Sequence, residues 1–553
     1  MPRRNTATIA SIYLMLFLPI ASAARGGGAL PDNDIPMKAL VDELARSMED
    51  LVLEDLPRPY FIQYNAQDRI TFNMRAAYGA LLRSDRDRYR FITCRVRVGS
   101  PKLDNTNMGR GSGGRATLPL DDNQAALRHA IWQMTDSDYK HAVETLTRKQ
   151  AFLKQKTVED RPDDFSSARP VRAIQPSAEI AFDNKQWEDN VERLSARFKQ
   201  YPKIQNSGVT FFAGAENRWI VNSEGTRLRT ADTGVSVEIH AQLQAEEGMH
   251  LADELFYLGL QIDHLPTIEE MLAGIDRMCE KLTALSQAPV LEHYTGPVLF
   301  EPIAAGKVFQ ALLADGLCAT PIPIGSGGWG DTSLEKKIGQ RILPRSFNVY
   351  DDSGPQRFEG TILAGAYTYD DEAVQPGRVT LVEKGILKTL LAGRAPTRRI
   401  KKTTGHGRSG GYGDAHATIG CLYVYDDDGM SADELKEKLI QAVREEGLEF
   451  GLRIESMEAG GYGELGDPIY AYKVYVDDGR EELIRGMEFL PTETRSLRRI
   501  LAAGAERKVY NAPAGIPVSV IAPAIILEEL ELTKIEREFD KLPILKPPPQ
   551  RTK

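Results

Sequence analysis

The sequence predicts an α+β protein of two domains, with mixed, largely antiparallel sheets and flanking helices. Three observations predict this class. Runs of β-forming residues return in both halves of the chain. Amphipathic helical segments stand between them, without the regular βα alternation that a parallel sheet requires. The 553 residues also exceed what a single hydrophobic core usually organises.

The first predicted domain covers residues 30–290. It opens with an amphipathic helix, MKALVDELARSMEDLVL, and continues with the strand-like runs PYFIQYNAQ, RITFNMRAAYGALL and RYRFITCRVRVGS. A helical insert follows at about 120–202, with an expected break near Thr135-Asp136-Ser137. Strands return from Val209 to Leu243, and a helix over Ile268–Leu285 precedes the boundary.

The second predicted domain covers residues 291–535. It begins with the strand-like PVLFEP and the short helical segment GKVFQALLADGL, Gly306 to Leu317. Gly325 to Asp331 form a glycine-rich loop, which we interpret as a lid or connection anchored by Trp329. Ser431 and Glu434 have the spacing of a capping box and predict a helix start. VSVIAPAIILEELEL closes the domain, and residues 536–553 form a Pro-rich tail expected to be loose.

The first 23 residues have the pattern of a signal peptide. Arg3 and Arg4 precede an apolar run from Ile9 to Ile20, and Ala21-Ser22-Ala23 suits a cleavage site. The run is shorter than the roughly 20 residues that cross a bilayer, although an uncleaved anchor is the alternative interpretation. We therefore expect an exported protein, periplasmic or extracellular, that begins near Ala24 and has no stable membrane span.

Charge and cysteine content exclude two classes of protein. The formal net charge of −9 argues against a general nucleic-acid binder, which needs a basic face for phosphates. No cysteines form a CxxC pair, so a cysteine-rich zinc module is excluded. We expect the four cysteines to be buried free thiols; they are Cys94, Cys279, Cys318 and Cys421.

Several phrases, in order along the chain, resemble the TldD/PmbA family, the metallopeptidase-related proteins once described as modulators of DNA gyrase. They are NSEGT (Asn222 to Thr226), GPVLFEP at Gly296, YDDEAVQPGRVTLVEKGILKTLLAGRAPTRR from Tyr369, GHGRSGGYGDAH, and VSVIAPAIILEELEL. The likeness covers roughly residues 205–535. It implies a two-domain α+β fold and a dimer around an enclosed peptide-binding groove.

The resemblance also implies a zinc site that this chain has lost. Catalytic members carry HExxxH on a helix and a further cysteine ligand near the C-terminus. At those helix positions this chain has Gln310, Ala311 and Asp315, and no cysteine follows Cys421. An amide is a poor zinc ligand, a methyl group is no base, and a lone carboxylate binds a hard ion only weakly. HExxH, HExxxH and HxxEH are absent from the whole sequence.

The sequence therefore resembles the subunit type without zinc, which pairs with a zinc-bearing one. It predicts no cofactor, no catalytic residue and a pseudoenzyme that binds peptide or unfolded polypeptide, as a homodimer or in a heterodimer with a zinc-bearing subunit. Candidate groove residues lie in the second glycine-rich stretch: His406, Arg408, Asp414 and His416. The alternatives are an active peptide hydrolase that uses His406 and His416 with carboxylates, and a structural envelope protein.

Two further clusters of titratable residues have a simpler interpretation. His250 and Glu254 lie among other acids and at helical i,i+4 spacing, which is typical of an exposed acidic helix; a metal site is the alternative. The pairs Asp351–Asp352 and Asp371–Glu372 stand beside Gly and Pro, and we expect them in turns.

Overall fold

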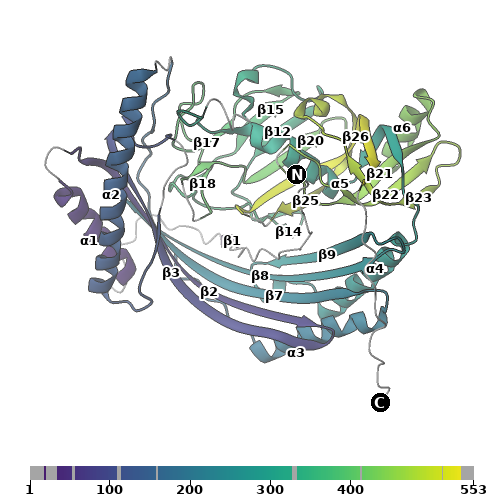
Figure 1. Cartoon of the computed structure of the whole chain (residues 1–553), viewed down its shortest axis with the longest axis horizontal. Coiled ribbons are helices and arrows are strands. Elements are labelled where there is room, and N and C mark those ends of the chain that lie inside the picture. Colours follow the sequence, from purple (N-terminus) through teal and green to yellow (C-terminus); the bar gives the residue numbers. More distant parts are fainter. Residues whose placement is uncertain are drawn as a thin grey trace.

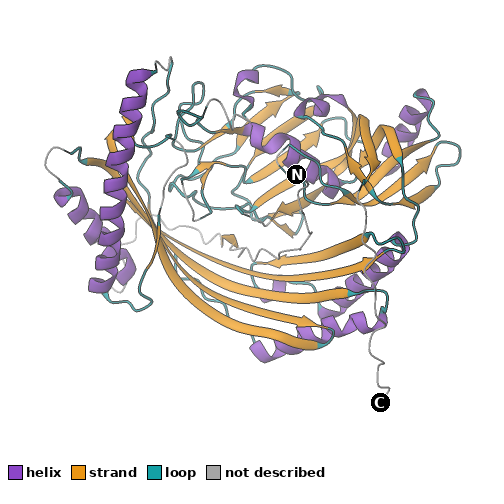
Figure 2. Ribbon diagram, viewed as in Figure 1, coloured by secondary structure: helices purple, strands orange, loops and turns teal. Residues whose placement is uncertain are grey.

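The computed structural model describes residues 18–19, 34–52, 56–108, 114–156, 160–326, 333–410, 414–461, 463–512 and 515–536. Two large sheets organise the chain (Figures 1 and 2). The first half builds a long curved sheet with helices on its outer side, and the second half builds a compact sheet that lies over the inner side. The predicted α+β class with largely antiparallel sheets is confirmed.

The first sheet has nine strands in the order β1-β8-β7-β2-β3-β4, with β5 on β3 and both β6 and β9 on β8. A two-residue turn joins its longest hairpin, because Tyr78 and Gly79 both adopt positive φ, as a type I′ turn requires. The strand bounds are β1 Leu18–Pro19, β2 Pro59–Ala77, β3 Ala80–Ser100, β4 Leu103–Asp104, β5 Arg115–Thr117, β6 Arg172–Ile174, β7 Asn206–Asn222, β8 Arg227–Gln244 and β9 His250–Gly259.

The two faces of this sheet differ in chemistry because side chains alternate along each strand. The outer face is apolar and packs against helices; Tyr64 contributes to one core cluster there and Met74 to another. The inner face carries buried polar residues, including Gln63 and Gln67, and meets the second domain. The helices are α1 Ile35–Asp50, α2 Gln124–Gln155, α3 Asn184–Ala196, η1 Arg197–Gln200, η2 Ile262–His264 and α4 Ile268–Leu285.

The second sheet has eleven strands in the order β16-β15-β12-β20-β26-β10-β21-β22-β23, with β24 and β25 also on β26. Among the described strands of this sheet, only β10–β21 and β20–β26 pair in parallel. The bounds are β10 His293–Phe300, β12 Phe347–Asp351, β15 Val379–Glu383, β16 Ile386–Leu387, β20 Cys421–Asp426, β21 Phe450–Met457, β22 Pro468–Tyr475, β23 Glu481–Ile484, β24 Met487–Phe489, β25 Ile500–Ala512 and β26 Val518–Lys534.

Short elements complete the second domain. Three two-stranded ribbons are β11 Cys318–Ala319 with β17 Leu391–Ala392, β13 Arg357–Phe358 with β14 Thr361–Ile362, and β18 Gly407–Arg408 with β19 His416–Ala417. The helices are α5 Pro302–Phe309, η3 Gln310–Ala314, η4 Asp315–Leu317, η5 Leu334–Lys337, α6 Ala432–Glu445 and η6 Thr494–Arg499. The predicted capping box is confirmed at the start of α6, where Ser431 and Glu434 bond reciprocally.

Two local predictions were wrong. The insert helix is unbroken at Thr135, because the Thr135 hydroxyl donates 2.7 Å to the Ile131 carbonyl within the helix instead of capping a new one. The segment with His250 and Glu254 is strand β9 and not a helix. It is held by a ladder on β8 in which His240 pairs with Glu254, so tertiary pairing overrides the helical spacing.

Some predictions fall outside the described residues. The signal-peptide segment does so except for Leu18–Pro19, as do Trp329 and all but the first residue of the Pro-rich tail. All four cysteines are buried and unpaired, as expected. In the described residues, no helix is both long and apolar enough for a transmembrane span.

Candidate functional site

The positions of the lost zinc motif lie at the end of α5. Pro302 occupies the first turn, where its missing N–H costs no hydrogen bond, and Ala304, Ala305, Val308 and Phe309 bury the helix in the core. At Gln310 the helix changes to a π turn, η3, and at Asp315 to the 3₁₀ turn η4. Gln310, Ala311 and Asp315 are half-buried.

The π turn matters because of the spacing of the motif. In HExxxH the two histidines are five residues apart, which on a regular α-helix places them about 140° apart around the axis. A turn closed by i→i+5 hydrogen bonds instead brings residues five apart onto one face. The π turn spans Gln310–Ala314 and Asp315 follows it, so positions 310 and 315 lie nearer to one face than on a regular α-helix, while their side chains lack the chemistry.

These side chains do not fit zinc. They offer one amide oxygen, one methyl group and one carboxylate, against the imidazole and thiolate ligands that zinc prefers. Burial raises the pKa of Asp315 to about 6, and no hydrogen bond or ion pair of its carboxylate is seen within the described part of the chain. Across that part, no group of three or more His, Cys, Asp or Glu side chains is placed to hold a metal ion.

A second cluster joins the two domains at Asp371. Its carboxylate accepts from Arg218 of β7 at 2.5 Å, and from the Ser409 N–H and hydroxyl at 2.7 and 3.0 Å. Gln63 of β2 donates to the Asp371 carbonyl at 3.0 Å. Burial raises the pKa of Asp371, but Arg218, Arg408 and the Ser409 bonds outweigh it and hold the pKa at about 2. The carboxylate is therefore a charged tie between the first sheet and the glycine-rich loop.

The neighbouring acids fix the loop backbone. Asp370 accepts from the main-chain N–H groups of Glu372, Val374 and Gly407 at 2.7 to 3.0 Å. Glu372 accepts from the Arg394 N–H at 2.6 Å, and a Cβ on Gly407 would stand 2.2 Å from Glu372 Oε2. Asp371 and Glu372 do lie in a turn, as expected, whereas Asp351 ends strand β12, where it is fully buried, so that expectation was wrong. Asp370 and Glu372 are buried and order the loop, which turn composition alone does not reveal.

The NSEGT turn joins the same contact region. Asn222 accepts from the N–H groups of Glu224 and Thr226 through its side chain, which shapes the turn. Glu224 then accepts from Arg394 at 2.8 Å, and the Arg394 Nε donates to the Ser166 carbonyl at 3.0 Å. Phrases that lie far apart in the sequence therefore meet between the domains.

The four candidate groove residues lie on or beside the β18–β19 ribbon. His406 is fully buried: its Nε2 lies 3.0 Å from Asp351 Oδ1, and its Nδ1 lies 3.0 Å from the Thr404 carbonyl oxygen. Arg408 stacks 4.3 Å from the Tyr367 ring centroid and pairs across the ribbon with His416, which is exposed. Asp414 forms an ion pair with Arg95 of β3. Arg408 and Asp414 thus face the first sheet, whereas His406 lies in the core.

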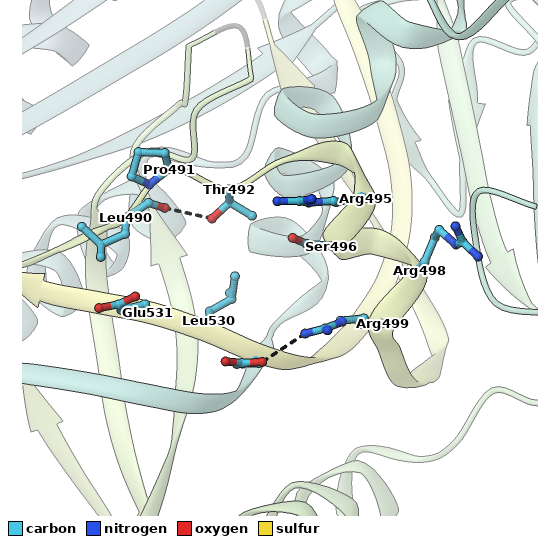
Figure 3. Close-up of a pocket in the computed structure, with 10 residues that line it drawn as sticks. Leu490, Pro491, Thr492, Arg495, Ser496, Arg498, Arg499, Leu530 and Glu531 are labelled. Atoms are coloured by element: carbon cyan, nitrogen blue, oxygen red, sulfur yellow. Dashed lines mark hydrogen bonds and ion pairs between the residues drawn. The ribbon is translucent and has the colours of Figure 1, made fainter. Parts of the chain in front are cut away.

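A polar cavity of about 760 Å³ lies behind the π turn. η6 forms one wall and contacts the turn through Thr494, whose hydroxyl donates 2.7 Å to the Leu312 carbonyl. Figure 3 shows the Thr492 hydroxyl bonded to the Leu490 carbonyl. Arg499 Nη1 donates to Glu529 Oε2 at 3.0 Å. Arg495 pairs with Glu493. Because Thr492, Arg495 and Arg499 already have partners, the cavity does not indicate a particular ligand.

Asp138 of α2 gives a pH-dependent prediction. Burial raises its pKa to about 7, whereas an aspartate in an unfolded chain titrates near 4. Stability contributed by its neutral form is therefore lost as the pH rises through about 7. We expect Asp138→Asn to increase the free energy of unfolding by about 1–2 kcal/mol at pH 8 and to change it little at pH 4. Urea titrations at both pH values test this, and an equal effect at both would contradict it.

Comparisons with known proteins identify the family of the second domain. Residues 293–534 match the family model described as the PmbA/TldA metallopeptidase C-terminal domain. The second half of the chain is therefore a domain of the TldD/PmbA family. The predicted family is therefore confirmed.

Solved structures share the fold of this chain across both domains. A Thermotoga maritima protein described as a candidate modulator of a DNA gyrase superposes with a TM-score of 0.60 at 15% identity, covering 90% of this chain and 99% of its own. TldE from Thermococcus kodakarensis superposes with a TM-score of 0.57 at 14% identity, covering 90% and 100%. At these identities the likeness concerns the fold alone.

Sequence relatives are archaeal proteins named metalloproteases. That of Methanothermobacter thermautotrophicus is 26% identical over 243 residues, 43% of this chain and 50% of the relative. That of Methanocaldococcus jannaschii is 32% identical over 108 residues, 19% of this chain and 23% of the relative. The matches thus span half of the first relative and about a quarter of the second.

Proposed function

We propose that this TldD/PmbA protein binds extended peptides between its two sheets and performs no zinc-dependent hydrolysis. The observation that carries the proposal is the π turn of η3. It brings positions 310 and 315 toward one face, but an amide and a lone carboxylate make a poor ligand set for zinc, and the Ala311 methyl group cannot act as a base. The chain is similar in sequence to relatives named metalloproteases and lacks the HExxxH groups for zinc chemistry.

The inner face of the first sheet supports peptide binding. It is rich in buried polar side chains, and three of their oxygen atoms have no hydrogen-bond partner: Asn65 Oδ1, Asn73 Oδ1 and Asp232 Oδ1. Buried polar atoms are normally satisfied, so such acceptors favour a ligand that brings N–H groups. A peptide main chain does so at every residue other than proline.

We further propose that the chain acts as a dimer, either with itself or with a zinc-bearing family member whose peptidase it completes. The missing ligands and the likeness to a TldE structure support this assignment. Size-exclusion chromatography with light scattering, alone and with a zinc-bearing relative, tests the assembly. A chain that stays monomeric in both mixtures would rule it out.

Elemental analysis and a peptide assay test the central proposal. After dialysis against micromolar zinc, we expect well under one zinc per chain and binding of unfolded peptides without cleavage. A zinc-bearing relative treated in parallel should retain zinc and serves as the control. Stoichiometric zinc in this chain, or its hydrolysis of the peptides, would overturn the proposal.

Export remains a proposal that rests on the pattern of residues 1–23. Protein recovered from outside the cytoplasm is expected to begin near Ala24. N-terminal sequencing after cell fractionation measures this directly. Intact chain recovered only from the cytoplasm would contradict the proposal.

A further inference from the structure

A small pocket opens between the two helices that pack side by side on the outer face of the first sheet, α1 and α2 (Figure 1). Its volume is about 350 Å³. Six residues line it: Glu43 and Arg46 of α1, and Ala125, Arg128, His129 and Trp132 of α2. The four residues of α2 have the spacing i, i+3, i+4 and i+7, so they share one face of that helix.

Glu43 lies at the bottom of this pocket and binds both arginines. Its side chain is 2% exposed. Oε1 accepts from Arg46 Nε at 2.9 Å and also from Arg46 Nη2, and Oε2 accepts from Arg128 Nε at 3.3 Å. A buried carboxylate that accepts from two guanidinium groups holds both in place, because losing them would leave its charge buried and unpaired.

The arginines keep donors that Glu43 does not use. Arg128 uses Nε on Glu43, and among the described residues neither its Nη1 nor its Nη2 has a hydrogen-bond partner. Arg46 Nη1 comes only within 3.9 Å of the exposed Asp50, a contact that water weakens. Without counting His129, two guanidinium groups against one carboxylate leave the pocket one positive charge, in a chain whose formal net charge is −9.

Trp132 gives the pocket an aromatic wall. It is 40% exposed, and its ring centroid lies 5.4 Å from that of His129 with an angle of 39° between the two planes. A flat apolar ring placed against the indole would remove apolar surface from water and make a stacking contact. An exposed tryptophan beside unused guanidinium donors therefore favours a ligand that combines an aromatic ring with an anion.

A carboxylate suits this pocket better than a phosphate does. The terminal nitrogens of a guanidinium form a planar fork that matches the two oxygens of a carboxylate. One negative charge balances the one positive charge of the pocket, whereas a phosphate monoester carries more. The volume lies near the lower end of the range for small-molecule sites, so the pocket fits one small molecule and not a folded partner.

We propose that the α1–α2 pocket binds a small aromatic carboxylate, with the ring against Trp132 and the carboxylate on Nη1 and Nη2 of Arg128. The pocket lies on the outer side of the first sheet, so it is separate from the inner face to which we assign peptides and does not depend on that assignment. A free acid and the aromatic C-terminal residue of a polypeptide carry this same chemistry.

Matched probes test the class of ligand on the native chain. Saturation-transfer difference NMR compares indole-3-propanoate with its uncharged analogue, indole-3-propanamide. We expect a Kd of about 1 mM for the carboxylate, which is usual for a ligand of this size in an open pocket, and binding at least about fivefold weaker for the amide. Equal binding of the two probes, or no saturable binding of the carboxylate, would overturn the proposal.

A third probe identifies the source of the carboxylate. N-acetyltryptophan differs from indole-3-propanoate only by an acetamido group, which stands for the preceding peptide bond. Tighter binding of N-acetyltryptophan would support the C-terminus of a polypeptide as the ligand, whereas tighter binding of indole-3-propanoate would support a free acid.

Substitutions in the pocket test the place of binding. Arg128→Met keeps the aliphatic part of the side chain and removes the donors, so it should weaken indole-3-propanoate at least about fivefold and leave the amide unchanged. Trp132→Ala removes the ring contact and should weaken both probes by a similar factor. If Arg128→Met does not fold, Arg128→Lys replaces it, because that variant keeps the charge beside Glu43 but loses the planar fork.

Two controls match these substitutions elsewhere on the surface. Arg148→Met removes an exposed arginine farther along α2, and Phe256→Ala removes an exposed aromatic residue of β9. Both variants should bind the two probes as the native chain does. A control that weakens binding as much as the pocket variants do would place the ligand elsewhere and overturn the assignment to the α1–α2 pocket, and so would unchanged binding in both Arg128→Met and Trp132→Ala.

Discussion

Replacing Gln310 and Asp315 by histidine and Ala311 by glutamate is expected to give this chain a zinc affinity that the native chain lacks. The reason is geometric. The π turn of η3 brings positions five residues apart toward one face, so we expect two imidazoles introduced there to reach one metal ion. The site would still lack a cysteine ligand, so we expect micromolar binding and not that of a complete site. Competition with a chromogenic zinc chelator measures it.

A matched control distinguishes the effect of the π turn from the effect of the HExxxH sequence. Asp433→His with Lys438→His creates the same HExxxH sequence around Glu434 on α6, which is a regular α-helix. There the two histidines point about 140° apart around the axis and cannot share one ion. We expect zinc binding at least tenfold weaker than in the η3 variant. Equal affinities would show that the π turn does not position the ligands.

The sequence predicted most helices and strands, but not the contacts between segments that are remote in sequence. Capping residues and β-forming runs predicted α6 and the antiparallel sheets, because these signals are local. The unbroken helix at Thr135 and the strand at His250 depend on partners remote in sequence, and residue spacing does not encode them. The sequence analysis also did not predict the π turn, although the five-residue spacing of the histidines in the family motif HExxxH was a usable signal for it.

Some residues of the candidate site were likewise predicted from the sequence, whereas others became evident only from the fold. The family phrases identified the degenerate positions at Gln310, Ala311 and Asp315, since a lost motif can be read directly from residue types. Asp371 was interpreted as an ordinary turn acid, because only the fold brings Arg218 of β7 against it. Asp232 carried no sequence signal at all, as its significance lies in a buried oxygen without a partner.

Asp371→Ala is expected to lower the free energy of unfolding by about 3–5 kcal/mol, because it leaves Arg218 buried without its partner. The side chains of Arg218 and Asp371 are 13% and 7% exposed, so water cannot replace the lost carboxylate. Urea unfolding at pH 7 measures the loss. Glu269→Ala is the control: it breaks an ion pair with Arg193 that is 70% and 55% exposed, and should cost less than about 1 kcal/mol.

The same carboxylate sets a pH window that distinguishes charge from packing. The pKa of Asp371 lies at about 2 in the folded chain and near 4 when unfolded, so its contribution is complete above about pH 4 and is lost as the pH falls toward 2. The difference in stability between native chain and Asp371→Ala should therefore narrow between pH 4 and pH 2. If the difference in the free energy of unfolding stays constant over this range, the Asp371 side chain acts through packing. That result would refute a stabilising ion pair between Asp371 and Arg218.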